Sequence, residues 1–119
     1  MTNHPADPAT VEDSLQVEGE LHQHEYISLI EHWSKLDSRL RSFRKGSVEL
    51  HLWIKERETP SQHVTLEAKI AGLKTLVATS SDADFGHALN EVRDEMIRQV
   101  TDAKTRSEPR NNRKLRQSG

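Results

Sequence analysis

The sequence predicts an α+β domain in which two helices pack on one face of a four-stranded mixed sheet. Four short segments alternate apolar and polar residues, as strands with one buried face do, and two longer segments repeat apolar residues at three-and-four spacing, as amphipathic helices do. In chain order these segments give β-α-β-β-β-α. Because each helix has one apolar stripe and each strand one apolar face, all of them are buried only if both helices cover the same face of the sheet.

The first strand and the first helix are predicted from a change of period. Leu15 and Val17 alternate with polar neighbours and predict a short strand that ends at Gly19. A helix of about five turns is predicted next, up to the basic Lys45 and the helix-terminating Gly46. Its apolar stripe consists of Tyr26, Leu29, Ile30, Trp33, Leu36, Leu40 and Phe43. A helical crossover of this kind predicts that the first two strands are parallel.

The remaining three strands are predicted to form an antiparallel meander. Apolar residues alternate with polar ones over 48–54 and again over 64–70, with a turn at 58–61 between them. Gly72 marks a tight hairpin, and residues 76–78 supply the fourth strand. The second, third and fourth strands are therefore expected to lie side by side in that order.

A second long helix is predicted after the last strand. Asp84 is its expected N-cap, because a carboxylate at this position accepts hydrogen bonds from the unpaired amides of the first turn. Pro109 is expected to end the helix. Its buried stripe consists of Phe85, Leu89, Val92, Met96 and Val100.

Charge is distributed unevenly along a chain whose formal net charge is −2. Residues 1–34 carry seven acidic residues and no Lys or Arg, whereas residues 93–119 carry eight basic and four acidic residues. We expect a disordered N-terminal arm over 1–13, because it has two prolines and almost no large apolar residue, a domain over 14–106, and a flexible basic tail over 107–119.

Several functional classes are not expected. The chain has no Cys for disulfides or thiolate metal sites, no glycine-rich phosphate loop, no GxSxG and no HExxH, so we expect neither an enzyme nor a cofactor. His22 and His24 could supply two metal ligands, but no third has a suitable spacing, and we expect no metal. Residues 1–13 do not resemble a signal peptide, and no apolar run approaches the ~20 residues that span a bilayer. We therefore expect a cytoplasmic protein with no membrane partner and no small-molecule substrate.

Basic residues gather on the predicted helix flanks. At 100° per residue, Lys35 and Arg39 share one flank of the first helix with His32. On the second helix, Arg93 and Lys104 lie about three whole turns apart and share a flank as well. Cationic flanks beside a groove between two helices suit phosphates, although the same pattern also describes ordinary solvated faces. Arg98 has Asp94 and Asp102 one turn away on either side, so we expect ion pairs to occupy it partly.

The open face of the predicted sheet offers an alternative surface. Trp53 is its one aromatic residue, and it could stack on a base or cover its cross-strand neighbours; we favour packing. The residues predicted on this face are Gln16, Glu18, Glu49, His51, Trp53, Lys55, Glu67, Lys69 and Val77.

The order and spacing of several segments resemble the hibernation-promoting factor and ribosome-associated translation inhibitor family. Residues 33–43 (WSKLDSRLRSF) resemble the end of that family's first helix, and residues 48–57 (VELHLWIKER) follow at the family's spacing. Residues 76–81 (LVATSS) resemble the last strand, and residues 94–100 (DEMIRQV) the second helix. The resemblance covers roughly residues 14–106. Asp102 stands where the family commonly has Lys, and Gly86 where it commonly has an aromatic residue.

The resemblance implies a function that needs no catalysis. A protein of this family binds 16S-type rRNA in the decoding channel of the small ribosomal subunit, excludes messenger and transfer RNA, and so silences translation under stress; off the ribosome we expect a monomer. The alternatives are a protein-interaction module that uses the Trp53 face, or a non-ribosomal RNA binder. Lys35, Arg98, Lys104 and Arg106 match basic family positions, and five further residues lie on the same surfaces: Arg39, Arg41, Arg44, Lys45 and Arg93.

Overall fold

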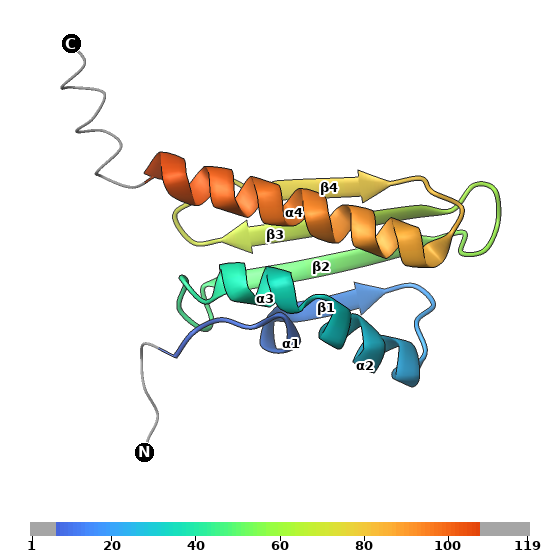
Figure 1. Cartoon of the computed structure of the whole chain (residues 1–119), viewed down its shortest axis with the longest axis horizontal. Coiled ribbons are helices and arrows are strands. Elements are labelled where there is room, and N and C mark those ends of the chain that lie inside the picture. The colour runs from blue at the N-terminus through green and yellow to red at the C-terminus, as the bar shows by residue number, and fades with distance from the viewer. Residues whose placement is uncertain (1–6, 108–119) are drawn as a thin grey trace, which may run out of the picture.

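The computed structural model describes residues 7–107 and confirms the predicted α+β architecture (Figure 1). Four strands form one mixed sheet in the order β1-β2-β3-β4, with helices on one of its faces (Figure 1). The elements are α1 (Val11–Ser14), β1 (Leu15–Glu18), α2 (Gln23–His32), α3 (Ser34–Leu40), β2 (Val48–Lys55), β3 (His63–Ile70), β4 (Leu76–Ser80) and α4 (Phe85–Ser107).

The strand pairing confirms the predicted topology. β1 runs parallel to β2, with Val17 opposite Leu52, and the β2–β3 and β3–β4 pairs are antiparallel. The turn after β3 contains Gly72 with a φ of +87°, as the predicted hairpin requires. Asp84 is confirmed as a cap, because its Oδ1 accepts a hydrogen bond from the His87 amide at 3.0 Å.

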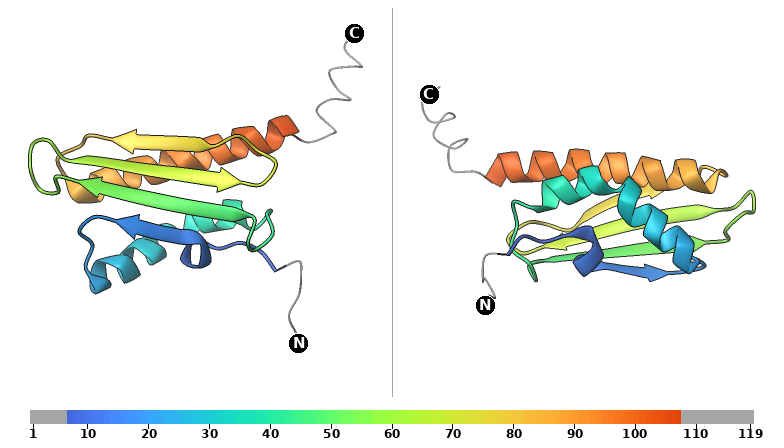
Figure 2. Two further views of the ribbon diagram at one scale, coloured as in Figure 1. Left: turned by 180° about the vertical axis from the view of Figure 1, so that it is seen from behind. Right: turned by 60° about the horizontal axis from the view of Figure 1, so that its bottom comes forward.

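The core lies between the helices and the covered face of the sheet. Along β2, every second side chain from Val48 to Ile54 is buried, and the same alternation holds in β3 and β4. On the helix side, the core contains Trp33, between α2 and α3, and Leu36 and Leu40 of α3. Helix α4 contributes Ala88, Val92, Met96 and Val100. The view from behind shows the opposite face of the sheet without a helix over it (Figure 2, left).

The prediction of a disordered arm over 1–13 was wrong for residues 7–13. Ala9 and Val11 are fully buried, and the Thr10 side chain accepts a hydrogen bond from the Asp13 amide at the start of α1. The Ala9 amide also donates to the Phe43 carbonyl at 2.9 Å. The rest of the segment is exposed or half-buried, and backbone hydrogen bonds to the turn after α3 hold it in place. Residues 1–6, and the predicted tail from 108 onward, lie outside the described residues.

The prediction of a single first helix up to Lys45 was also wrong, because the structure has two helices there, α2 and α3, and α3 ends at Leu40. At Trp33 the backbone adopts φ −96° and ψ 22°, and the chain changes direction there (Figure 2, right). Hydrogen bonds still cross the break, from the Trp33 amide to the Leu29 carbonyl and from the Asp37 amide to the Trp33 carbonyl. The bend lets α3 pack against α4 while the fully buried Trp33 remains in the core.

Gly19 is the position where backbone geometry demands a glycine. Its φ is +125°, and a Cβ added there would lie 2.8 Å from Ile54 Cβ and closer still to the Ile54 carbonyl oxygen. We expect Gly19→Ala to lower the free energy of unfolding by about 2–4 kcal/mol, from backbone strain and from this clash together. Urea unfolding followed by circular dichroism measures the loss.

Gly72→Ala is the matched control for this prediction. Gly72 also has a positive φ, of +87°, but no atom lies within 4 Å of an added Cβ. Only the backbone term remains, and we expect a loss of about 1 kcal/mol. Equal losses at the two glycines would contradict the role given to the contact with Ile54.

Candidate nucleic-acid interface

Four basic side chains of α3 and the turn after it are exposed and carry no ion pair to any residue in 7–107. They are Lys35, Arg39, Arg41 and Arg44. The one acidic residue among them, Asp37, is engaged elsewhere, because its Oδ1 accepts a hydrogen bond from the Val11 amide at 2.8 Å. We call these four residues the α3 cationic edge, and none of them is paired with Asp37.

The N-terminal segment holds the turn that carries part of this edge. Pro8 forms an isolated antiparallel bridge with Arg44, and the Lys45 amide donates to the Asp7 carbonyl at 2.7 Å. The Lys45 ammonium lies 3.8 Å from the Asp13 carboxylate, but both side chains are about half exposed, so this pair contributes little energy. Sequence reasoning missed this contact because residues 7–13 offered only isolated apolar side chains.

Arg93 joins α4 to the end of α2. Its Nη1 donates to the His32 carbonyl at 3.2 Å, and its Nε donates to the Asp94 carboxylate at 2.8 Å. Arg93 is half-buried. The residue it contacts, His32, is the last residue of α2 and comes three residues before Lys35. The structure thus places Arg93 against the end of α2, with one side of its guanidinium already occupied by Asp94.

Arg98 is held by carboxylates of its own helix. It donates to both Glu95 oxygens and lies 3.4 Å from the Asp102 carboxylate. The hydrogen bond raises the pKa of Arg98 and lowers the pKa of Glu95 from their ordinary values. The predicted partner Asp94 was wrong, because Asp94 pairs with Arg93 instead. Lys104 is half-buried and Arg106 exposed near the end of the described residues.

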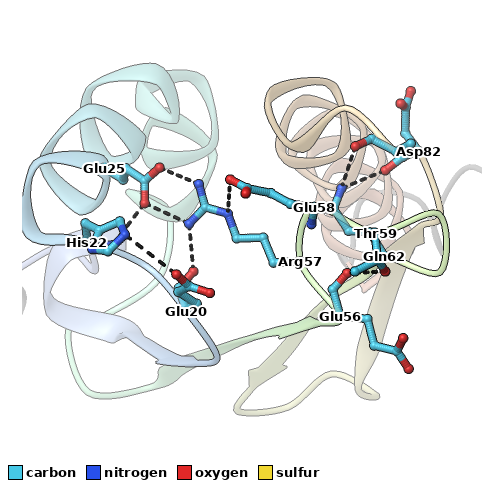
Figure 3. A network of polar contacts seen from close by, with 10 residues as sticks. Glu20, His22, Glu25, Glu56, Arg57, Glu58, Thr59, Gln62 and Asp82 are labelled. Carbon is cyan, nitrogen blue, oxygen red and sulfur yellow. Dashed lines mark hydrogen bonds and ion pairs between the residues drawn. The ribbon is translucent and has the colours of Figure 1, made fainter.

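Arg57 forms a buried polar cluster that sequence reasoning missed (Figure 3). Only 9% of its side chain is exposed, and its guanidinium donates to both Glu25 oxygens at 2.8 and 2.5 Å and to the Glu20 carbonyl at 2.9 Å. It also lies 4.0 Å over the centre of the Phe85 ring. Arg57 thereby ties the β2–β3 loop to α2 and to the start of α4, and it is unavailable to a ligand.

Gln62 fixes the other end of the same loop. Its buried amide nitrogen donates to the carbonyls of Asp82 and Ala83 at 2.8 and 3.2 Å, and its oxygen accepts from the Glu58 amide at 2.9 Å (Figure 3). Glu56 and Glu58 both have positive φ, which this network holds in place. The β2–β3 loop is thus held to the β4–α4 link by Gln62 and to α2 by Arg57.

The Glu25–Arg57 pair predicts acid sensitivity. The hydrogen bond from Arg57 lowers the pKa of Glu25 from 4.5 to about 2, so the pair stabilises the fold above pH 4.5 and its contribution is lost as the pH falls toward 2. Glu25→Gln should lower the free energy of unfolding by about 1–2 kcal/mol at neutral pH. Urea unfolding at pH 7 and pH 2.5 should show the variant and the wild type converging in acid, and an equal gap at both pH values would contradict this role.

A cleft of about 290 Å³ opens between α2 and the first turns of α4. Its apolar part comes from Leu29, Trp33, Phe85 and Leu89, and polar side chains lie around it. The full lining is His24, Glu25, Ser28, Leu29, His32, Trp33, Phe85, Gly86, Leu89 and Asn90. This cleft could not be predicted from apolar periodicity, because its lining comes from two segments that are distant in sequence, residues 24–33 and 85–90.

The open face of the sheet is nearly balanced in charge. Trp53 is half-buried and stacks on the His51 ring of the same strand, with centroids 4.0 Å apart and planes 3° apart, rather than on one of its cross-strand partners. Glu49 lies opposite Lys69, and His51 opposite Glu67. Cross-strand neighbours of opposite charge leave little net attraction for an anionic ligand.

Two observations bear on other classes of site. The rings of His22 and His24 stack 5.9 Å apart, and within the described part of the chain no group of three or more His, Asp or Glu is arranged to hold a metal ion. Among the helices of residues 7–107, none is both long enough and apolar enough to cross a bilayer.

No protein-family model matches the chain, and no curated protein matches its sequence. The resemblance of its segments and the positions of its cations are thus the observations from which a function is inferred. Of the nine predicted binding residues, four form the α3 cationic edge, whereas Lys45, Arg93 and Arg98 each have a carboxylate partner.

Proposed function

We propose that the protein binds 16S-type rRNA in the decoding channel of the small ribosomal subunit and silences translation by excluding messenger and transfer RNA. The observation that carries the proposal is the α3 cationic edge, where Lys35, Arg39, Arg41 and Arg44 are exposed without an ion pair to a described residue. The α+β fold and the resemblance of residues 14–106 to the hibernation-promoting factor family support the same reading.

The physical basis is electrostatic anchoring followed by steric exclusion. Each cation that reaches an RNA phosphate releases a condensed counterion, and this release favours binding most at low salt. A guanidinium can bind two phosphate oxygens at once, and three of the four residues of the edge are arginines. No bond is made or broken, so the function requires no cofactor and no small-molecule substrate.

The two flanks of α4 differ in how they would meet RNA. Glu91, Asp94 and Glu95 lie with Arg98 beside β4, and these carboxylates repel phosphates. RNA should therefore approach from the α3 side, where Arg93 is close to the α3 cationic edge. Lys104 and Arg106 are assigned to the C-terminal continuation of this contact. In this proposal the protein works in the cytoplasm, as a monomer away from the ribosome.

A protein partner is the second candidate, favoured by one observation on the opposite face. Val77 is 46% exposed on β4, and the stacked Trp53 and His51 lie on β2 of the same face, with β3 between them, so the open sheet carries some apolar surface. Binding through this face should tolerate salt and should be weakened by Trp53→Ala. A binder of RNA in general would instead lose ribosomes fully to competing free RNA.

Co-sedimentation with purified small ribosomal subunits over a series of salt concentrations tests the proposal. If the four cations of the edge each contact a phosphate, the logarithm of affinity should fall with the logarithm of salt at a slope of about −3 to −4. An excess of unstructured RNA should displace the protein only partly. Salt-independent binding, or none at low salt, would overturn the proposal.

A further inference from the structure

We propose that the cleft between α2 and α4 holds one unpaired nucleobase of the RNA whose phosphates lie on the α3 cationic edge. This inference rests on the proposed function and adds to it a site for a base beside the sites for phosphates. The cleft measures about 290 Å³, a volume that accommodates a single base. Unstacked bases in loops are the usual target of base-specific RNA recognition.

The floor of the cleft suits the face of a base. The partly exposed Phe85 and Leu89 of α4 form its accessible floor, and the buried Leu29 and Trp33 lie directly behind them, which makes the floor apolar and partly aromatic. The Arg57 guanidinium fixes Phe85 in position and covers one face of its ring, 4.0 Å from the ring centre, so the other face and the ring edge are left for a ligand. A rigid aromatic and apolar surface binds a base through stacking and through displacement of water.

The rim offers hydrogen bonds to the edge of a base. The exposed Asn90 side chain makes no hydrogen bond to any described residue, so both its donor and its acceptor are available. An amide of this kind matches the paired donor and acceptor of adenine. Across the cleft, Ser28 and His32 bond each other at 3.2 Å, so the His32 ring is already oriented.

Charge along the two helices indicates RNA rather than an apolar peptide as the occupant. The lining residues His24, Ser28 and His32 recur every four residues on α2, and Lys35 and Arg39 continue the same side of the chain along α3. On α4, Arg93 follows Asn90 by three residues and donates to the His32 carbonyl at 3.2 Å. A base in the cleft would therefore have its backbone next to cations, which an apolar peptide does not need.

Gly86 keeps the cleft open and provides a way to close it. It lines the cleft, and only Asp84 Oδ1, at 3.4 Å, lies within 4 Å of an added Cβ. A leucine at this position would place its side chain in the space proposed for the base. An alanine would not fill it, so Gly86→Ala serves as the matched control.

Fluorescence of Trp33 reports on the cleft through the lining side chains that cover its ring. The chain has two tryptophans, and Trp53→Phe leaves only Trp33, whose fully buried ring lies directly behind the lining of the cleft. In this background a hexamer of adenylate should change Trp33 emission and bind at least about tenfold more tightly than an abasic ribose-phosphate hexamer of equal charge. Gly86→Leu should reduce affinity for the adenylate hexamer to that of the abasic one, whereas Gly86→Ala should retain the preference.

Three results would overturn the inference. The first is equal affinity for the two hexamers, and the second is binding of the adenylate hexamer by Gly86→Leu as tightly as by the parent protein. The third is a change in Trp33 emission with N-acetyl-phenylalanine amide but not with adenylate, which would assign the cleft to a peptide side chain. Unfolding in urea shows that each variant remains folded.

Sedimentation with small subunits separates this inference from the proposed function. Gly86→Leu should weaken subunit binding about tenfold, and Lys35→Glu with Arg39→Glu should weaken it at least about 100-fold at low salt. If only the charge reversal weakens binding, the base site is wrong and ribosome binding by the α3 cationic edge stands. If neither change weakens it, both are wrong.

Discussion

Lys35→Glu combined with Arg39→Glu is expected to reduce affinity for the small ribosomal subunit by at least about 100-fold at low salt. Both side chains are exposed on α3 without a carboxylate partner among the described residues, so each is available to a phosphate. The double variant loses two phosphate contacts and gains two repelling charges. The salt slope of binding should also fall by about two, one for each lost contact. Co-sedimentation over a salt series measures both quantities.

Lys55→Glu combined with Lys69→Glu is the matched control. Both lysines are exposed on the open face of the sheet, opposite the helices, and the change in net charge is the same. This variant should keep most of its affinity and its full salt slope. If it loses as much affinity as the α3 variant, net charge rather than the α3 cationic edge governs binding.

Trp33→Ala is expected to lower the free energy of unfolding by about 3–5 kcal/mol. Trp33 is fully buried where α2 meets α3, and its removal leaves a cavity that both helices and the sheet would have to fill. Because domains of this size are stable by only about 5–15 kcal/mol, the variant should lie close to unfolding at room temperature. Urea unfolding followed by circular dichroism measures the change.

The second tryptophan provides the comparison. Trp53 is half-buried and stacks on His51 at the open face, where truncation leaves no enclosed cavity. Trp53→Ala should therefore lower the free energy of unfolding by only about 1 kcal/mol. Comparable losses at the two positions would show that the open face is covered by more than the structure indicates.

Most of the fold follows from local periodicity. The alternation over 48–54 and 64–70 predicted β2 and β3 to within one residue at each end, because one face of each strand is buried and the other is not. The break at Trp33 could not be predicted in this way. Three-and-four spacing specifies which side of a helix is buried, and it is the same for one straight helix and for two segments that bury the same side.

The candidate site was predictable where it depends on a single helix. Lys35 and Arg39 were placed on one flank from their spacing, and both are exposed there. Partners from distant segments could not be inferred: Asp37 binds the Val11 amide, and Arg57 reaches Glu25 across 32 residues of sequence. Within α4, sequence spacing places several acidic residues near Arg98. The side-chain conformations determine that Arg98 pairs with Glu95 and Asp102.

Chemical footprinting of 16S-type rRNA in small subunits, with and without the protein, tests the central claim most directly. We predict that the wild-type protein protects nucleotides of the decoding channel and that Lys35→Glu with Arg39→Glu removes this protection. Protection confined to another part of the subunit, or none at protein concentrations that saturate co-sedimentation, would contradict the proposal that the α3 cationic edge anchors the protein in that channel.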